Sequence, residues 1–159
     1  MHYSKIQVFS LVILRLSIGW HFLYEGGVKV LNPHWTSKTY LLDSGGFLKG
    51  FFEQIAGNQT VLTFSNHANA YGLTLIGLSL VIGIFTRYSS IAGMVLLFLY
   101  YLSHPAIPGI EYLFPSDGSY FIINKTLVES FSLMVIYAFP TSGIFGLQRI
   151  IKSDKSFLE

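Results

Sequence analysis

Long runs of apolar residues, separated by polar connections, dominate the chain. They extend over about residues 8–31, 68–85, 89–104 and 121–139. A helix of about 17–25 mostly apolar residues is long enough to cross the hydrocarbon core of a bilayer. We therefore expect each run to form a membrane-spanning helix. The second and third runs are separated by Thr86, Arg87 and Tyr88, so they should form a tight antiparallel hairpin.

The two longer connections differ in character. Residues 36–55 mix aromatic side chains with Lys38, Asp43, Lys49 and Glu53, which is too polar for a span and typical of short helices at a membrane interface. Residues 105–120 are rich in proline and glycine, which predicts an irregular loop. The expected fold is an all-α integral membrane four-helix bundle, with short interfacial helices in the first long loop, in a single domain over residues 1–159.

Composition narrows the functional classes. The chain is 52% hydrophobic and 11% charged, whereas an ordinary soluble domain carries about 25% charged residues. A soluble enzyme and a nucleic-acid binder are therefore poor interpretations, and the natural environment is the lipid bilayer. The absence of cysteine removes disulfides, thiol nucleophiles and iron–sulfur ligation.

Basic residues predict the orientation. One side of the bundle would carry Lys5, Arg87, Arg149, Lys152 and Lys155, and the other Lys38 and Lys49. Because basic loops stay on the cytoplasmic side, we expect both termini in the cytoplasm and the two long loops outside. The expected location is the cytoplasmic membrane of a bacterium or archaeon.

Polar side chains inside the predicted spans are the candidates for function. A charge near the centre of a span costs roughly 2.5–3.5 kcal/mol on insertion scales, so such residues normally face the bundle interior. His21, Glu25 and Lys29 are four residues apart and share one helix face. The full set of candidate pocket or buried polar residues is Arg15, His21, Glu25, Lys29, His104, Asn124, Lys125 and Glu129.

Two compatible interpretations of these charges remain open. They can form structural ion pairs that fix helix register, such as Arg15 with Glu129 and Glu25 with Lys125. They can also line an outward-facing pocket for an anion or a polar head group, in which Arg15, His21, Lys29 and Lys125 supply the positive charge.

Other chemistry has weaker support. The five histidines show no spacing typical of haem or zinc ligation, so we expect no metal and no haem. His21 beside Glu25 is either a proton carrier or a hydrogen-bonded interior histidine. Trp20 and Trp35 are either interface or packing aromatics, or rings on which a quinone could stack.

Residues 14–29, LRLSIGWHFLYEGGVK, resemble the opening helix of the DoxX/DoxD family, whose pattern is an LR, a G, then W/F-H-x-x-x-E-G-x-x-K. Residues 31–35 (LNPHW) resemble the DoxD branch, residues 83–87 (GIFTR) its middle hairpin, and residues 124–129 (NKTLVE) its last helix. The resemblance implies a four-helix membrane protein. It carries over Arg15, His21, Glu25, Lys29, Lys125 and Glu129 as shared positions, without making any of them catalytic.

The resemblance also implies a function. DoxD is the membrane subunit of thiosulfate:quinone oxidoreductase, which joins two thiosulfates into tetrathionate, passes electrons to quinone and acts with the small partner DoxA. Other DoxX-like proteins join membrane oxidoreductase complexes. We therefore expect a subunit of a quinone-linked oxidoreductase that oxidises thiosulfate or a related small anion, with quinone as its cofactor. Its partners would be a small soluble or membrane subunit, or further copies of itself.

The sequence leaves enzymatic activity open, because more distant relatives are assembly chaperones. The alternative is a non-enzymatic membrane scaffold or assembly chaperone, or a protein that binds a small molecule or lipid. A small transporter is a third hypothesis, which would require oligomers because four helices are few for alternating access.

Overall fold

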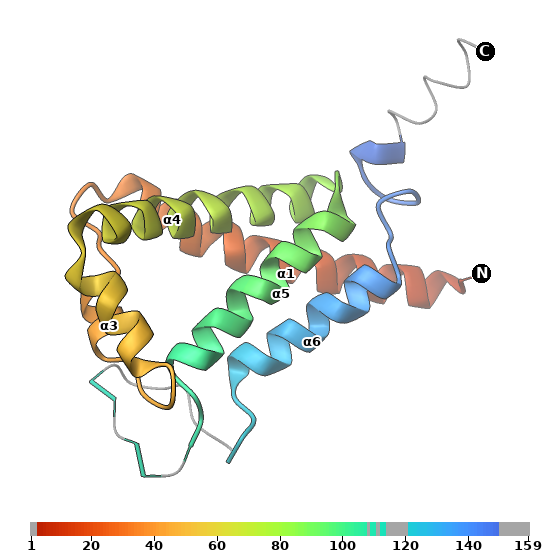
Figure 1. Cartoon of the computed structure of the whole chain (residues 1–159). Helices are drawn as coiled ribbons and strands as arrows, with labels where there is room; N and C mark the ends of the chain where they lie inside the picture. Colours follow the sequence, from red (N-terminus) through yellow and green to blue (C-terminus); the bar gives the residue numbers. More distant parts are fainter. Residues whose placement is uncertain (1–2, 108, 111, 114–120, 150–159) are drawn as a thin grey trace.

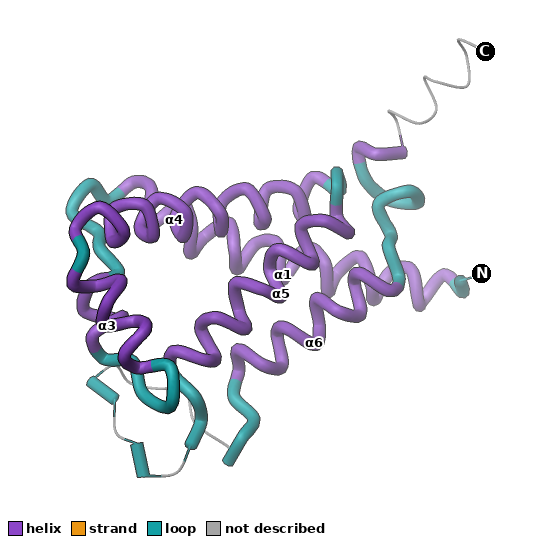
Figure 2. The backbone as a smooth tube through the Cα atoms, viewed as in Figure 1, coloured by secondary structure: helices purple, strands orange, loops and turns teal. Residues whose placement is uncertain are grey.

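The computed structural model describes residues 3–107, 109–110, 112–113 and 121–149. All the regular elements in these residues are α-helices, joined by short turns and two longer connections (Figure 2). They are α1 (Lys5–Leu31), α2 (Lys38–Leu42), α3 (Lys49–Gly57), α4 (Gln59–Ile82), α5 (Thr86–Ser103) and α6 (Lys125–Ala138).

The four long helices form two pairs. Helices α1 and α4 lie side by side along their length, and α5 packs against α6 in a second pair that runs at an angle to the first (Figure 1). The short helices α2 and α3 lie at one end of the molecule. The start of α1 and residues 139–149 lie at the other end (Figure 1). The bundle therefore has two chemically different ends.

Local capping explains where the first two long helices begin. At the start of α1, Ser4 and Gln7 form a reciprocal capping box, so this helix begins just before the predicted span. Helix α4 begins at Gln59 rather than near residue 68, because the side chain of Asn58 accepts the backbone N–H groups of Thr60 and Val61. Residues predicted as loop therefore extend α4.

The hairpin between α4 and α5 turns earlier than predicted. Gly83 adopts a left-handed conformation with φ 77° and ends α4, as a residue without a Cβ can do freely. Thr86, Arg87 and Tyr88 therefore form the first turn of α5, and the prediction that they link the two helices is wrong. The antiparallel hairpin itself is present, and Ser89 donates a hydrogen bond to Ser79 across it.

The last long helix is shorter than its apolar run. Asn124 caps α6 by accepting the N–H of Leu127 at 3.0 Å, so residues 121–124 lie outside the helix. The 14 residues of α6 extend over about 21 Å at the usual rise per residue. That length is below the thickness of about 30 Å of a typical hydrocarbon core.

The prediction of short helices in the first long connection is confirmed. Helices α2 and α3 fall there and are held against α4 by a small apolar cluster of Leu41, Phe52, Ala56 and Leu62. In the second connection, residues 105–107, 109–110 and 112–113 form a loop, as predicted. Residues 114–120 of that predicted loop, and Lys152 and Lys155, lie outside the described residues.

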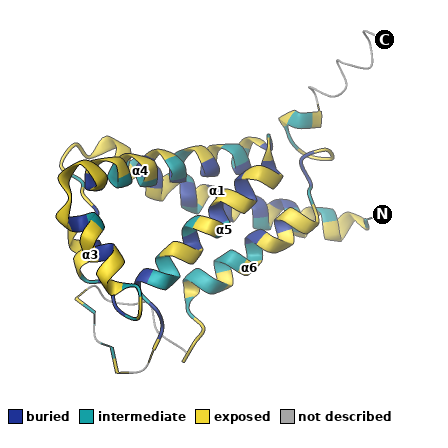
Figure 3. Cartoon of the chain, viewed as in Figure 1, coloured by how far each residue is buried: buried dark blue, intermediate teal, exposed yellow. Residues whose placement is uncertain are grey.

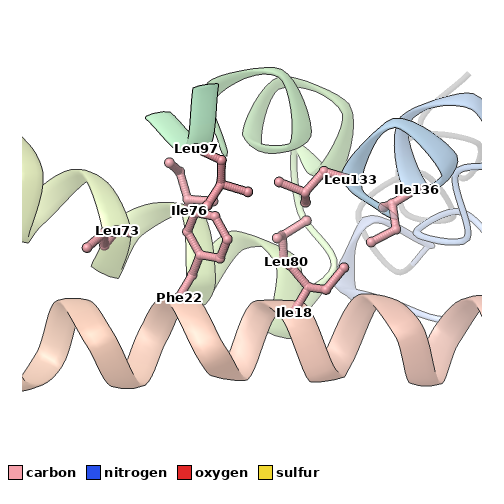
Figure 4. Close-up of a cluster of buried hydrophobic side chains, with 8 residues drawn as sticks. All are labelled: Ile18, Phe22, Leu73, Ile76, Leu80, Leu97, Leu133 and Ile136. Carbon is pink, nitrogen blue, oxygen red and sulfur yellow. The ribbon is translucent and has the colours of Figure 1, made fainter. Parts of the chain in front are cut away.

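The core lies where all four long helices meet. Its buried side chains come from each of them and point toward one another (Figure 4); they are Ile18, Phe22, Leu73, Ile76, Leu80, Leu97, Leu133 and Ile136. Helices α1 and α4 approach so closely that a Cβ built on Gly26 or Gly77 would collide with the backbone of Thr74 or Leu23. Small residues permit such contacts between helices.

The outer faces of the long helices are apolar and exposed (Figure 3). Phe9 is 64% exposed, Phe64 74% and Phe98 52%. By length and composition, α1 is the one helix of the described residues that is long and apolar enough to cross a membrane. Arg87 and several serines reduce the apolar character of α5, polar residues do the same in the first half of α4, and α6 is short.

Candidate functional site

A pocket of about 600 Å³ lies between the two helix pairs and is covered by the segment that carries α2. We call it the main pocket. It is large enough for a drug-sized molecule or the ring of a cofactor. Polar and apolar side chains from α1, α2, α4, α5 and α6 line it, including His21, Phe22, Glu25, Lys29, Trp35, Tyr40, Asn69, Leu73, Leu97, Tyr100, Lys125 and Glu129.

His21 and Glu129 form the closest charged contact of the main pocket. The Nδ1 atom of His21 lies 2.6 Å from Oε1 of Glu129, a short hydrogen bond that joins α1 to α6. The Glu129 side chain is only 11% exposed, whereas that of His21 is 41% exposed. A carboxylate that accepts from Nδ1 orients the ring and leaves Nε2 to act on a ligand. The pair can therefore hold or move a proton at the pocket wall.

Lys29 occupies the opposite part of the wall. Its ammonium donates to Oδ1 of Asn69 at 3.2 Å and lies 3.6 Å from the carboxylate of Glu25. The same atom lies 5.2 Å from the ring centre of Trp35 and 5.8 Å from that of Tyr100, which is cation–π distance. Asn69 also donates a hydrogen bond to the hydroxyl of Tyr100. This network fixes Lys29 between two flat aromatic faces.

Aromatic rings continue from the main pocket toward the loop after α5. Tyr40 contacts Tyr100 edge to face and stacks on His104 with ring centres 4.0 Å apart. Tyr112 lies 4.7 Å beyond His104 and donates to the carbonyl of Pro105. Burial raises the pKa of the Tyr40 hydroxyl, and to a lesser degree the pKa of Tyr112, so both phenols remain neutral donors.

Arg15 lies away from the main pocket, at the end of the bundle where α4 joins α5. Its side chain is 1% exposed, and Nη1 donates to Oγ1 of Thr141 at 3.0 Å. The Nε atom has no hydrogen-bond partner among the described residues. The ion pair of Arg15 with Glu129, considered above as a structural pair, is not formed, because the Arg15 side chain turns toward Gly83 and the segment after α6.

The second predicted ion pair is also absent. Glu25 pairs with Lys29 one turn along its own helix and not with Lys125, although all three line the main pocket. Short-range pairing within α1 satisfies the carboxylate without ordering a side chain of another helix.

Three other predicted residues lie outside the lining of the main pocket. Trp20 is 64% exposed on the outer face of α1, so it is not placed to stack on a ring there. Asn124 caps α6 beside the pocket residue Lys125. His104 follows α5, and its Nε2 atom lies 3.5 Å from the carboxylate of Asp43.

Sequence reasoning missed several neighbours of the candidate residues. Asn69 and Tyr40 complete the polar wall of the main pocket, and Asp43 accepts the N–H of Leu113 through both oxygens at 3.0 Å. An amide at the edge of an apolar run was an available signal for Asn69. Tyr40 and Asp43 lie in the connection between the first two predicted spans. No helical periodicity could therefore relate their positions to those of the residues in the spans.

The main pocket suits an organic ring better than a metal. In the parts of the chain that the structure describes, no group of three or more histidine and carboxylate side chains could hold a metal ion. Trp35 and Tyr100 offer flat faces, Phe22, Leu73 and Leu97 are apolar, and Lys29 and His21 carry N–H donors. A lining of flat aromatic faces, apolar side chains and a few polar groups can accommodate an organic ring.

In the residues that the structure describes, the protein is a small helical bundle with exposed apolar outer faces and a charged pocket between its helices. The comparison with protein families matches residues 10–105, more than half of the chain, to the DoxX family, which is membrane-associated. The chain therefore belongs to the DoxX family. No curated protein and no solved structure matches it.

Proposed function

We propose that this protein is the membrane subunit of a quinone-linked oxidoreductase, and that the main pocket binds the quinone head. The observation that carries the proposal is the combination of the flat faces of Trp35 and Tyr100 with the ammonium of Lys29 and the Nε2 atom of His21. When bound, a quinone supplies the two-electron acceptor. Lys29 would donate to one carbonyl oxygen. The imidazolium form of His21, held by the Glu129 carboxylate at Nδ1, would donate its Nε2 proton to the other.

The substrate that we propose is thiosulfate or a related small anion, as in the DoxD-like subtype that the first helix resembles. Lys29 and Lys125 supply positive charge in the main pocket, and such groups bind oxyanions well in a site of low dielectric. The chain contains no cysteine that could act as a thiol carrier. A separate small oxidoreductase subunit would accordingly complete the enzyme.

The same proposal places α1, α4, α5 and α6 across the bilayer. Their exposed phenylalanine, leucine and valine side chains would face lipid. In this arrangement the main pocket lies in the half of the bundle near α2 and α3, which the distribution of basic residues assigns to the outside.

A non-enzymatic role is the second candidate, and one observation favours it. The acidic side chains of the main pocket are each paired with a basic one, His21 with Glu129 and Lys29 with Glu25. A site with balanced charges can bind a zwitterionic lipid head or a small molecule, or serve as a rigid scaffold, without any redox step.

Quinone reduction separates the two candidates. We expect the purified protein, alone or with its partner subunit, to reduce a short-chain quinone at the expense of thiosulfate. His21→Gln should lower kcat about 100-fold, because it removes a proton-transferring group. His34→Gln is the matched control, since His34 is exposed and lies outside the main pocket. Absence of turnover in both preparations would favour the non-enzymatic candidate.

A further inference from the structure

A second cavity, of about 260 Å³, lies beside the main pocket, between the end of α1 and the first half of α4. We call it the side cavity. Its polar and aromatic lining consists of Lys29, Asn32, Trp35, Asn66, His67 and Tyr71. Four of these residues do not line the main pocket; they are Asn32, Asn66, His67 and Tyr71. The predictions from the sequence assigned no role to the space they surround.

The side cavity has a one-sided electrostatic character. Lys29 and His67 are basic, and no carboxylate lines the cavity among the described residues. His67 Nδ1 donates to the carbonyl of Thr63 at 2.8 Å, so that nitrogen carries a proton and Nε2 is the atom left for a ligand. On protonation Nε2 becomes a charged donor. The lining of the main pocket differs, because it includes Glu25 and Glu129; Glu25 also lies 3.6 Å from the Lys29 ammonium that the two cavities share.

The two amide side chains add donors rather than acceptors. Oδ1 of Asn66 accepts both the N–H and the hydroxyl of Ser37, at 2.9 and 2.6 Å. Oδ1 of Asn32 accepts the N–H of His34 at 3.1 Å. The amide nitrogen of Asn66 also donates one hydrogen to Thr36 at 3.3 Å, so Asn66 has one N–H group left for a ligand and Asn32 offers its amide N–H groups. Amide, imidazolium and ammonium donors together match an acceptor with several oxygens.

Lys29 and Trp35 line both cavities and so form their common wall. Trp35 comes from the loop before α2, and Asn66 fixes that loop to α4 through Ser37 and Thr36. The ammonium of Lys29, 5.2 Å from the Trp35 ring centre, is therefore within reach of a ligand on either side. An anion in the side cavity would therefore lie next to the main pocket.

We propose that the side cavity binds a tetrahedral oxyanion, held by Lys29 and His67 with the N–H groups of Asn32 and Asn66. The oxyanion is either a free ion or the phosphate of an anionic lipid head. Binding at this site does not require quinone chemistry, so the experiment below tests it independently of the proposed function.

The two tryptophans of the chain provide the test. Trp20→Phe removes the exposed ring and leaves Trp35, in the wall of the cavity, as the single tryptophan. In this variant, in neutral detergent, iodide should quench the fluorescence of Trp35. Sulfate should reduce this quenching in a saturable way, because it would occupy the side cavity. Phosphatidylglycerol dispersed in the same detergent forms the second arm. Protection by sulfate identifies a free ion, protection by the lipid alone identifies a head group, and protection by neither overturns the proposal.

Matched variants locate the anion. His67→Gln should weaken protection about tenfold, which is the effect of losing one hydrogen bond to a charged group. His34→Gln, an exposed histidine of the adjacent loop, should leave it unchanged. Lys125 lines the main pocket and not the side cavity. A larger loss in Lys125→Gln than in His67→Gln would place the anion in the main pocket and overturn the proposal.

Discussion

Arg15 and Lys29 show two ways of keeping a cation within apolar surroundings. Lys29 has a carboxylate, an amide and two aromatic faces around its ammonium. Arg15 has a hydroxyl as its partner and lies against Gly83, the residue that ends α4. The C-terminal end of a helix carries partial negative charge, which stabilises a nearby cation. The buried charge of Arg15 is therefore stabilised by packing and by the partial negative charge at the C-terminal end of α4.

This difference predicts the behaviour of Arg15 variants. Arg15→Ala should lower the free energy of unfolding by about 3 kcal/mol, because it leaves a cavity at a side chain that is 1% exposed. Arg15→Met keeps most of the volume and strands no opposite charge, so it should cost less than about 1.5 kcal/mol. Thermal unfolding in detergent, followed by circular dichroism, measures both. Equal losses would show that the charge itself is needed.

At the scale of elements, the contact between α1 and α4 organises the bundle. Gly19, Gly26 and Gly77 bring the two backbones together at points where a Cβ would contact the neighbouring helix. The polar stripe of α1 is thereby held next to Asn69 of α4. Close packing of one helix pair thus sets the geometry of the main pocket, which opens toward the second pair.

Glycines of the same helix provide a controlled test of that contact. Gly77→Ala should lower the free energy of unfolding by about 1–3 kcal/mol, since the added methyl group meets the backbone of Leu23. Gly72→Ala should instead raise it by about 0.5–1 kcal/mol, because its Cβ would meet no atom within 4 Å and alanine favours a helix. If both variants lose the same free energy of unfolding, the close contact is not what stabilises the packing of α1 against α4. Melting curves in one detergent suffice.

The sequence predicted the positions of the long helices better than the pairing of their charged side chains. Apolar periodicity located the four long helices, and four-residue spacing correctly grouped His21, Glu25 and Lys29 around one space. It did not predict which charges pair, because Glu129 meets His21 through the packing of α6, and Arg15 turns to the other end of α4. Helix ends also shifted where a single cap, at Asn58 or Gly83, decided them.

At the scale of the whole molecule, the two ends of the bundle separate two kinds of polar site. The main pocket and the side cavity lie near α2, whereas Arg15, Thr141 and Ser142 form a buried polar cluster with Thr86 at the end that carries α1's first residues. Figure 4 shows the core of leucine, isoleucine and Phe22, and three of its side chains, Phe22, Leu73 and Leu97, also line the main pocket. Arg15 and its partners do not line the main pocket, so the chain has two separate polar sites.

The arrangement makes a prediction about topology. If the four long helices all cross the bilayer, as proposed above, the basic residues at one end predict that both termini lie in the cytoplasm. Fusions of green fluorescent protein to either terminus should fluoresce, and fusions of alkaline phosphatase to the same sites should be inactive. A control fusion in the connection after Lys49 should show the opposite pattern. Active phosphatase at one terminus alone would mean that one helix, such as the short α6, does not cross.

The hydrogen bond between His21 and Glu129 joins residues 108 positions apart. In the proposed membrane arrangement, the first helix would enter the bilayer before Asn69 and Glu129, the partners of its lysine and histidine, have been synthesised. A chain truncated before residue 129 would keep His21 without its carboxylate partner, and we expect it to accumulate to a lower level than the full chain.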